Sequence, residues 1–318
     1  MICQARQLSA RSLGRLKRRR LFEARMTDSK IFENKLEFFK EHQNAPWSRL
    51  HYNIALFNLK RHITGKELTI LDAGGGNGIE TISLAQQGNK VVLLDYSDEM
   101  LAEARNNAKK YNLPHEINYI KGDVSLIPQL FEKESFDIVL CHRVLQYVEN
   151  KELVLNALSY AVKLQGILSI ICINRYSEPY RLAIQENNLS DAYKALDSNV
   201  IMSKVFDTPM KAYSAKDFSI PLQESGYEII GEYGIRCIND YIANNESKSD
   251  PKIYEEIEKL EYSMSDKYPY YLLARSFHIV AKKVNLENAA QPAAAPDLAF
   301  GSSSSIGFTS VFHCILGA

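Results

Sequence analysis

The chain has 318 residues, of which 46% are hydrophobic, and it carries 38 Lys and Arg residues against 38 Asp and Glu residues. This length suffices for one large domain or for one domain with an insertion. No apolar run reaches the roughly 18 residues that a membrane-spanning helix needs, so we expect no membrane partner. The five cysteines show no Cys-x-x-Cys spacing, and Cys141 and Cys172 lie inside apolar runs, which predicts buried, reduced thiols in a cytoplasmic protein without a metal site.

The charge is unevenly distributed along the chain. Residues 1–25 hold eight Lys and Arg residues and one acid, and residues 286–318 hold two acids and no base, which leaves 30 bases and 35 acids for the rest. An acidic body argues against a broad phosphate-binding surface. It leaves room for a small basic patch.

The N-terminal segment 1–25 allows two interpretations. Its run Arg18–Arg20 is compatible with a targeting peptide or a nucleic-acid-binding arm. Alternatively the protein starts at Met26, which opens a normal helix start, and the preceding residues are disordered or not native. We favour the second interpretation. Residues 32–63 then read as two helical pieces that are broken near Pro46.

The stretch 68–95 is the most informative part of the sequence. Leu68–Leu71 is a short apolar run that predicts a buried parallel strand, and Asp72 closes it. A glycine-rich turn, a helix over 79–87 and a second strand over 90–94 follow, and Asp95 closes that second strand. The glycines of the turn are Gly74, Gly75, Gly76 and Gly78.

This β-α-β unit favours a ligand that contains adenosine. Glycines allow a ligand to approach the backbone, and the following helix points free N–H groups at the turn. An acid at the end of the second strand can accept two hydrogen bonds from ribose hydroxyls. The dinucleotide fingerprint Gly-x-Gly-x-x-Gly fails because Ile79 stands at its third glycine. A glycine-rich turn without any nucleotide remains the alternative.

The next elements continue the alternation of strands and helices. We predict a helix from Ser97 to about Asn112, strands over 116–121, 136–141 and 166–173, and a helix over 151–162. In open α/β sheets, ligands bind beyond the carboxyl ends of the strands. His142 and Arg143 follow the fourth strand, so both should face the site.

The C-terminal half is less regular. Asn174-Arg175-Tyr176 ends the fifth strand at the same rim, and residues 177–210 have helical stretches that suggest an insertion over the substrate side. We predict a helix over 214–225, a strand over 227–237, a helix over 250–264 and a last strand within 268–280. From about Asn285 the Ala-, Pro- and Ser-rich composition predicts a disordered tail.

Several stretches resemble known methyltransferases. The spacing Asp-x-Gly-x-Gly-x-Gly, with an acid that closes the second strand, resembles the first motif of class I S-adenosylmethionine-dependent methyltransferases. A wider set resembles the tRNA 5-carboxymethoxyuridine methyltransferase family over roughly residues 40–283. The set comprises Leu71–Gly78, His142-x-Val-Leu-x-Tyr-Val, Gly234-Ile-Arg236-Cys-x-x-Asp240-Tyr241, Tyr254 to Glu261, Pro269-Tyr270, and Leu273-Ala-Arg275-x-x-His278-Ile-Val-Ala-Lys. The C-terminal stretches matter most, because the common methyltransferase fold does not require them.

The resemblance implies an α/β fold of the Rossmann-like class I type. We expect a mostly parallel central sheet with helices on both faces, and a helical insertion over about 177–210 after strand five. The methyltransferase domain would span residues 26–284, and residues 285–318 would form the disordered tail.

The resemblance also implies S-adenosyl-L-methionine as the cofactor. In this family the segment after Pro46 packs over the cofactor, so Arg49 is a candidate for the ligand carboxylate, or else an exposed helix arginine. Asp123 would meet the adenine amino group, or else be a turn residue. The complete set of expected cofactor contacts is Arg49, Asp72, Gly74, Gly75, Gly76, Gly78, Asp95, Tyr96, Met100, Asp123, Val124, Ser125 and His142.

The reaction implied by the family is methyl transfer to the carboxylate of 5-carboxymethoxyuridine at the tRNA wobble position. A carboxylate is already nucleophilic, so the enzyme must position it rather than deprotonate it. Cationic and hydrogen-bonding groups suit that task, and one or two arginines should reach the site. The candidates are Arg143, Arg175, Arg236 and Arg275, with Tyr241 and Tyr270. Two departures from the family, Ile173 before Asn174 and the poorly matching insertion, both fall on the substrate side.

Two other functions remain open. The first is a small-molecule carboxyl- or O-methyltransferase, which the acidic body favours, whereas the C-terminal motifs favour tRNA. The second is a non-catalytic protein that binds an S-adenosylmethionine analogue. Basic side chains at the rim would indicate tRNA as the partner, and a closed apolar lid would indicate a small-molecule acceptor. The sequence leaves the oligomeric state open.

Overall fold

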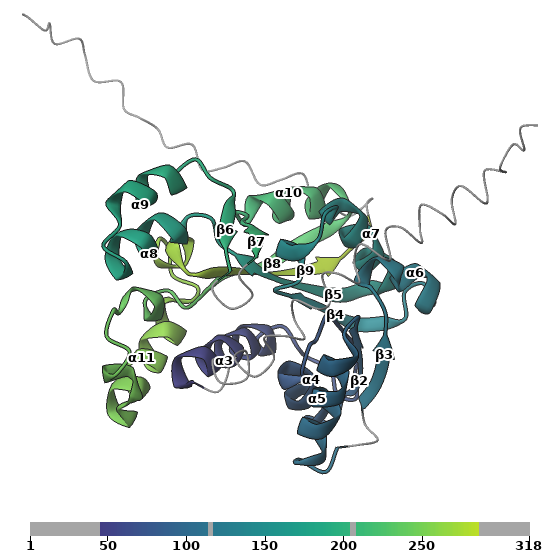
Figure 1. The fold of residues 1–318 in the computed structure, drawn as a ribbon. Coiled ribbons are helices and arrows are strands. Elements are labelled where there is room, and N and C mark those ends of the chain that lie inside the picture. The colour runs from purple at the N-terminus through teal and green to yellow at the C-terminus, as the bar shows by residue number, and fades with distance from the viewer. Residues whose placement is uncertain (1–44, 114–116, 204–207, 286–318) are drawn as a thin grey trace, which may run out of the picture.

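A computed structural model describes residues 45–113, 117–203 and 208–285 of the chain (Figure 1). The expectations for the basic segment 1–25, for the first helical piece before Pro46 and for the tail after Asn285 lie outside the described residues.

A seven-stranded sheet of order β3-β2-β1-β4-β5-β9-β8 forms the centre of the fold. Its strands are β1 (Thr69–Ala73), β2 (Lys90–Asp95), β3 (Ile117–Lys121), β4 (Phe136–His142), β5 (Val162–Ile173), β8 (Tyr227–Ile235) and β9 (Ser276–Lys283). Among them only β9 runs antiparallel to its neighbours. The carboxyl ends of the other six strands therefore share one edge with the amino end of β9, and this edge carries the site.

Helices cover both faces of the sheet, as the sequence predicts (Figure 1). On one face lie α3 (Pro46–Lys60), α4 (Ile79–Ala85) and α5 (Asp98–Lys109); on the other lie α6 (Ile127–Leu130), α7 (Lys151–Ala161) and α10 (Lys216–Glu224). Neighbouring strand residues alternate between the two apolar layers: Ile70 packs with Leu59 and Leu101, whereas Leu71 packs with Leu158. This alternation, with burial on both sides, explains the continuous apolar runs in the strands.

Helices α3 and α11 (Pro251–Met264) together cover the β5 and β8 side of the sheet. Leu50 and Ile54 of α3 pack with Ile171 of β5, Ile235 of β8 and Ile257 of α11. Helix α11 starts as predicted, because the Asp250 carboxylate caps its first N–H groups. The inner face of α3 is thereby held against the strands that end at the site.

The insertion after β5 combines the predicted helices with a small sheet that the sequence did not predict. Helices α8 (Ser177–Gln185) and α9 (Leu189–Ala195) precede the antiparallel pair β6 (Val200–Met202) and β7 (Pro209–Lys211). Each of these strands has three residues and buries only the central one, Ile201 or Met210. Three residues are too few to show a period of two, which is why the pattern escaped sequence analysis.

Among the described residues, no helix combines the length and the apolar character needed to cross a membrane. Within the same part of the chain, no cluster of three or more His, Cys, Asp or Glu side chains could hold a metal ion.

Candidate functional site

The turn between β1 and α4 presents backbone to an open side. Gly74, Gly76 and Gly78 have φ angles of 81°, 55° and 79°, a left-handed conformation that glycine adopts at least cost. A Cβ atom at Gly74 would lie 2.4 Å from Val144 Cγ2, so this glycine is required by packing. A Cβ atom at Gly76 would meet nothing within 4 Å. A ligand can therefore approach the turn closely at Gly76.

Asp95 closes β2 beside this turn. Its Oδ2 accepts a hydrogen bond from Gly76 N at 2.9 Å, and its Oδ1 accepts one from Ser97 N at 2.9 Å. Burial raises the pKa of the Asp95 carboxyl to about 6. A carboxylate accepts about four hydrogen bonds, so two more can come from the hydroxyls of a ribose. The expected contact Tyr96 is 39% exposed, and Met100 is buried.

Asp72 shapes the turn from below. Its Oδ2 accepts a hydrogen bond from Thr81 Oγ1 at 2.5 Å, and a Cβ at Gly75 would lie 2.6 Å from its Cγ. Burial, together with the nearby Glu80 carboxylate, raises the pKa of Asp72 to about 7. Asp72 thus fixes the glycine turn to the first turn of α4.

The expected adenine contacts follow β3. Asp123 precedes the 3₁₀ turn η1 (Val124–Leu126), and its Oδ1 accepts hydrogen bonds from Ser125 N at 2.8 Å and Ser125 Oγ at 2.5 Å. Val124 is buried. Gly122 N donates to Asp95 O at 3.0 Å, which joins this turn to the end of β2. The three residues therefore lie beside Asp95 at the sheet edge.

His142 ends β4 at the same edge, but its imidazole is bound to protein groups. Nδ1 lies 2.8 Å from Glu80 Oε1, and Nε2 lies 2.8 Å from Ser169 Oγ. Ser169 Oγ also lies 2.8 Å from His278 Nε2. These four buried side chains form a polar row that crosses β4, β5 and β9. Both ring nitrogens of His142 are thus occupied, so a ligand contact would come from its backbone.

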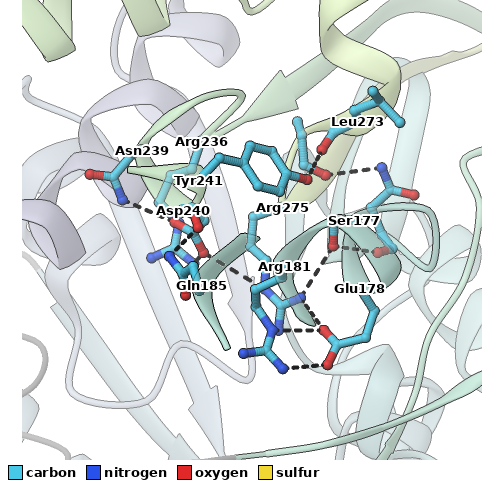
Figure 2. Close-up of polar contacts among 12 residues, drawn as sticks. Ser177, Glu178, Arg181, Gln185, Arg236, Asn239, Asp240, Tyr241, Leu273 and Arg275 are labelled. Carbon is cyan, nitrogen blue, oxygen red and sulfur yellow. Dashed lines mark hydrogen bonds and ion pairs between the residues drawn. The ribbon is translucent and has the colours of Figure 1, made fainter. Parts of the chain in front are cut away.

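Two of the four candidate arginines meet at the opposite end of the edge (Figure 2). Arg236 follows β8 and Arg275 precedes β9, and Asp240 lies between them, with its Oδ2 at 3.0 Å from Arg236 NH2 and 3.8 Å from Arg275 Nε. Glu178 of α8 bonds Arg275 NH1 at 2.6 Å and Arg181 NH2 at 2.5 Å. We call these five side chains the arginine network.

The charged groups in the arginine network shift one another's pKa values. Burial alone would raise the pKa of Asp240, but Arg236 and Arg275 hold it below its ordinary value. Burial lowers the pKa of Arg236, and the charges of Arg143 and Arg275 add to that shift. The Nε atom of Arg236 has no hydrogen-bond partner among the described residues. One donor of this buried guanidinium is therefore left unsatisfied by the described residues.

The other two candidate arginines are placed differently. Arg143 has a φ of 61°, and its N–H donates to Ile171 O at 2.7 Å. Its guanidinium forms no ion pair within the described part of the chain. Arg175 stacks over the Tyr176 ring at 5.8 Å from the ring centroid. Arg143 thus lies between the glycine turn and the arginine network, whereas Arg175 lies at the rim.

The tyrosine candidates and α11 hold the segment after β8. The Tyr241 hydroxyl donates to Leu273 O at 2.5 Å, whereas Tyr270 is 52% exposed. The Glu261 carboxylate of α11 accepts three backbone N–H groups, from Cys237 at 2.6 Å, Ile238 at 3.0 Å and Asn239 at 2.7 Å. The stretch ending at Glu261 therefore positions the loop between Arg236 and Asp240.

Arg49 is exposed on α3, and its charge lowers the pKa of Tyr254 on α11, a group whose pKa burial and Glu258 raise. It therefore lies on the α11 side of the helix. Sequence analysis missed Glu80, Glu178 and Arg181. The Glu178–Arg181 spacing of three on a helix was the available signal for the last two.

Comparisons with known proteins agree on the chemistry. A family profile described as a methyltransferase domain matches residues 64–234. The tRNA 5-carboxymethoxyuridine methyltransferase of Escherichia coli (strain K12) is 26% identical over 219 residues, which cover 69% of this chain and 81% of that protein. The ubiquinone biosynthesis O-methyltransferase of Rickettsia bellii (strain OSU 85-389) is 29% identical over 170 residues, which cover 49% and 68%.

Among solved structures, a SAM-dependent methyltransferase from Thermotoga maritima superposes with a TM-score of 0.54 at 16% identity. The alignment covers 80% of this chain and 99% of that one. At 16% identity, this structural similarity shows a shared fold and nothing more.

Proposed function

Because the chain belongs to the methyltransferase-domain family and uses S-adenosyl-L-methionine as methyl donor, we propose that it methylates the carboxylate of 5-carboxymethoxyuridine at the wobble position of tRNA. Such a substrate would place the reaction in the cytoplasm. The cofactor, when bound, supplies an electrophilic methyl group on a positively charged sulfur. The residues of this chain have to bind the two reactants and align them.

The gathering of Arg236 and Arg275 at the carboxyl edge of the sheet carries the proposal. Arg236 directly follows β8 and Arg275 directly precedes β9, and the Arg275 N–H donates to Arg236 O at 3.0 Å. Both residues share this edge of the sheet with Gly74 and Asp95. A carboxylate acceptor requires no general base, since its oxygen is already nucleophilic. It requires guanidinium or ammonium donors that fix its orientation, and bidentate arginines do this well.

The local charge balance also suits an anionic acceptor. Three arginines here face three carboxylates: Arg236 and Arg275 share Asp240, Arg275 shares Glu178 with Arg181, and Arg181 also pairs with Glu186. Arg143 adds a further cation without an ion pair in the described part of the chain. A positive potential at this rim can attract an anion although the body of the chain is acidic.

The relatives support tRNA over a small acceptor by the length of the shared stretch. The tRNA-methylating relative aligns over 219 residues, whereas the ubiquinone-pathway relative of Rickettsia bellii aligns over 170 and that of Rickettsia typhi over 197. A small-molecule O-methyltransferase, which the second relative exemplifies, is the competing function. The two functions predict different methylated products.

The test is incubation of the purified chain with S-adenosylmethionine and tRNA from a strain that lacks the methyl ester, followed by nucleoside mass spectrometry. We expect a gain of one methyl group on 5-carboxymethoxyuridine. Transfer RNA without this nucleoside is the control and should stay unmodified. If cofactor binding is intact and no ester forms, the tRNA proposal is wrong and a small-molecule acceptor replaces it.

A further inference from the structure

His51, on the inner face of α3, is a buried imidazole that no described residue hydrogen-bonds. It is 1% exposed, and neither Nδ1 nor Nε2 has a hydrogen-bond partner among the described residues. A buried polar group that lacks a hydrogen bond costs free energy, so such groups are uncommon and require an explanation. Neither the family motif nor the arginine network explains this one.

The surroundings of His51 are cationic. Burial lowers its pKa well below the ordinary value, and the charges of Arg143 and Arg236 lower it further, with smaller contributions from His142 and His278. The imidazole is therefore neutral, with one N–H donor and one bare nitrogen. The packing places the same two arginines beside α3. Leu50 and Ile54, which flank His51 on the helix, pack with Ile171 and Ile235. Ile171 O accepts the Arg143 N–H at 2.7 Å, and Arg236 directly follows Ile235.

These three side chains have donors without acceptors. Arg236 Nε is buried and unpartnered, and Arg143 has no ion pair, both within the described residues. Arg143 is followed by Val144, the side chain that a Cβ atom at Gly74 would strike at 2.4 Å. The group therefore lies between the glycine turn and the arginine network, where the two reactants must meet.

We propose that His51 donates a hydrogen bond to the carboxylate of a bound ligand, and that Arg143 and Arg236 complete the anion site. The reaction offers two such carboxylates. One belongs to the methionine part of the cofactor, and the other belongs to the acceptor, which rests on the function proposed above. Arg49 is placed less well for either, because two residues along a helix lie on nearly opposite faces and Arg49 is exposed.

The test compares His51→Leu, which removes both ring nitrogens, with His51→Gln, which keeps a donor. Asn58→Leu is the control for ligand binding, because Asn58 lies two turns along the same face, is buried, and has an unpartnered Nδ2 in the described structure. Its Oδ1 accepts a hydrogen bond from Ser265 Oγ at 3.2 Å, so the melting temperature of this variant is compared separately. Calorimetry would measure binding of S-adenosylhomocysteine and of 5′-methylthioadenosine, which lacks the carboxylate. Steady-state kinetics on tRNA would give KM and kcat.

We expect His51→Leu to weaken one ligand about tenfold or more, as loss of a charge-assisted hydrogen bond does, and His51→Gln to restore part of the loss. Weaker binding of S-adenosylhomocysteine with unchanged binding of methylthioadenosine would identify the cofactor carboxylate as the group that His51 contacts. Unchanged binding of S-adenosylhomocysteine with a raised KM for tRNA would identify the acceptor carboxylate. The apparent melting temperature without ligand should not fall, because the substitution removes an unpartnered polar group.

Two results would overturn the inference: unchanged binding and KM in both His51 variants, or equal losses in Asn58→Leu. A structural role for His51 would instead lower the melting temperature and leave ligand selectivity unchanged. If the wild-type protein fails to methylate tRNA, the proposed function falls. In that case, the binding affinities of S-adenosylhomocysteine and methylthioadenosine still test the role of His51, independently of tRNA methylation.

Discussion

The two ends of the sheet edge are constructed in different ways. At β1 and β2 the site consists of main-chain groups and the buried carboxylates of Asp72 and Asp95. Asp72 accepts a hydrogen bond from Thr81 Oγ1, and Asp95 accepts two from backbone N–H groups. At β5, β8 and β9 it consists of the arginine network, whose members are far apart in the sequence. Glu178 and Arg275, for example, are 97 positions apart. The first end depends on local conformation, and the second depends on the completed fold.

This difference predicts different failures. At the glycine-turn end, substitution of Asp95 should impair ligand binding and leave the fold intact. A substitution in the arginine network should impair the fold as well as the proposed acceptor site, because removal of one partner leaves buried charge uncompensated.

The largest effect should follow from Asp95→Ala. Without this carboxylate, the ligand would lose both ribose hydrogen bonds, each worth about 1.5–3 kcal/mol when one group is charged. S-adenosylhomocysteine should therefore bind at least about 100-fold more weakly. Calorimetric titration measures this directly. The control is Asp98→Ala, since Asp98 is exposed and pairs with Lys121 on the surface. Unchanged affinity in Asp95→Ala would refute the ribose assignment.

Arg275→Met should reduce the free energy of unfolding by about 3 kcal/mol, because Glu178 and Asp240 remain buried with less compensating charge. The side chains of all three are no more than 14% exposed. Urea unfolding followed by circular dichroism would measure the change. Arg175→Met serves as control and should cost less than about 1 kcal/mol, since Arg175 makes one stacking contact at the rim. Equal losses in the two variants would contradict the division of the site.

The smallest effect concerns pH. Burial raises the pKa of Asp95 to about 6, so its charged form destabilises the fold, and this penalty is relieved as the pH falls from 6 towards 4. The pKa of Asp240 is below the ordinary value, so its stabilisation persists down to that range. As the pH falls from 6 to 5, the free energy of unfolding of the wild type should rise by up to about 1.4 kcal/mol relative to that of Asp95→Asn. It should not change relative to that of Asp240→Asn.

Urea unfolding of the three proteins at pH 5, 6 and 7 would test this contrast. Equal pH profiles for the two variants would show that both carboxylates have the same environment, contrary to the structure.

Sequence analysis performed well at the glycine-turn end because the signals there are local. The first strand, the turn, the helix and the second strand are each confirmed to within one or two residues. Alternation also determines the direction of the His142 side chain: it shares a face with Leu140 and not with Cys141, which places its imidazole under α3.

The arginine network could not be predicted from pattern. Arg236 and Arg275 came into consideration through a family resemblance, and their partner Glu178 has no local feature that indicates a residue 97 positions away. The unpartnered state of His51 is equally invisible, because it depends on which groups three separate elements bring near α3. Long-range charge pairing requires the folded chain.

The polar row under α3 has one more consequence, which concerns hydrogen positions. The Ser169 hydroxyl carries a single hydrogen and lies 2.8 Å from the Nε2 atoms of both His142 and His278. Burial keeps His278 neutral by lowering its pKa. Ser169 must donate to one ring and accept from the other, so the tautomers of the two histidines are coupled. A change of charge at Glu80, beside the glycine turn, can thus reorder the protons as far as β9 without any movement of the backbone.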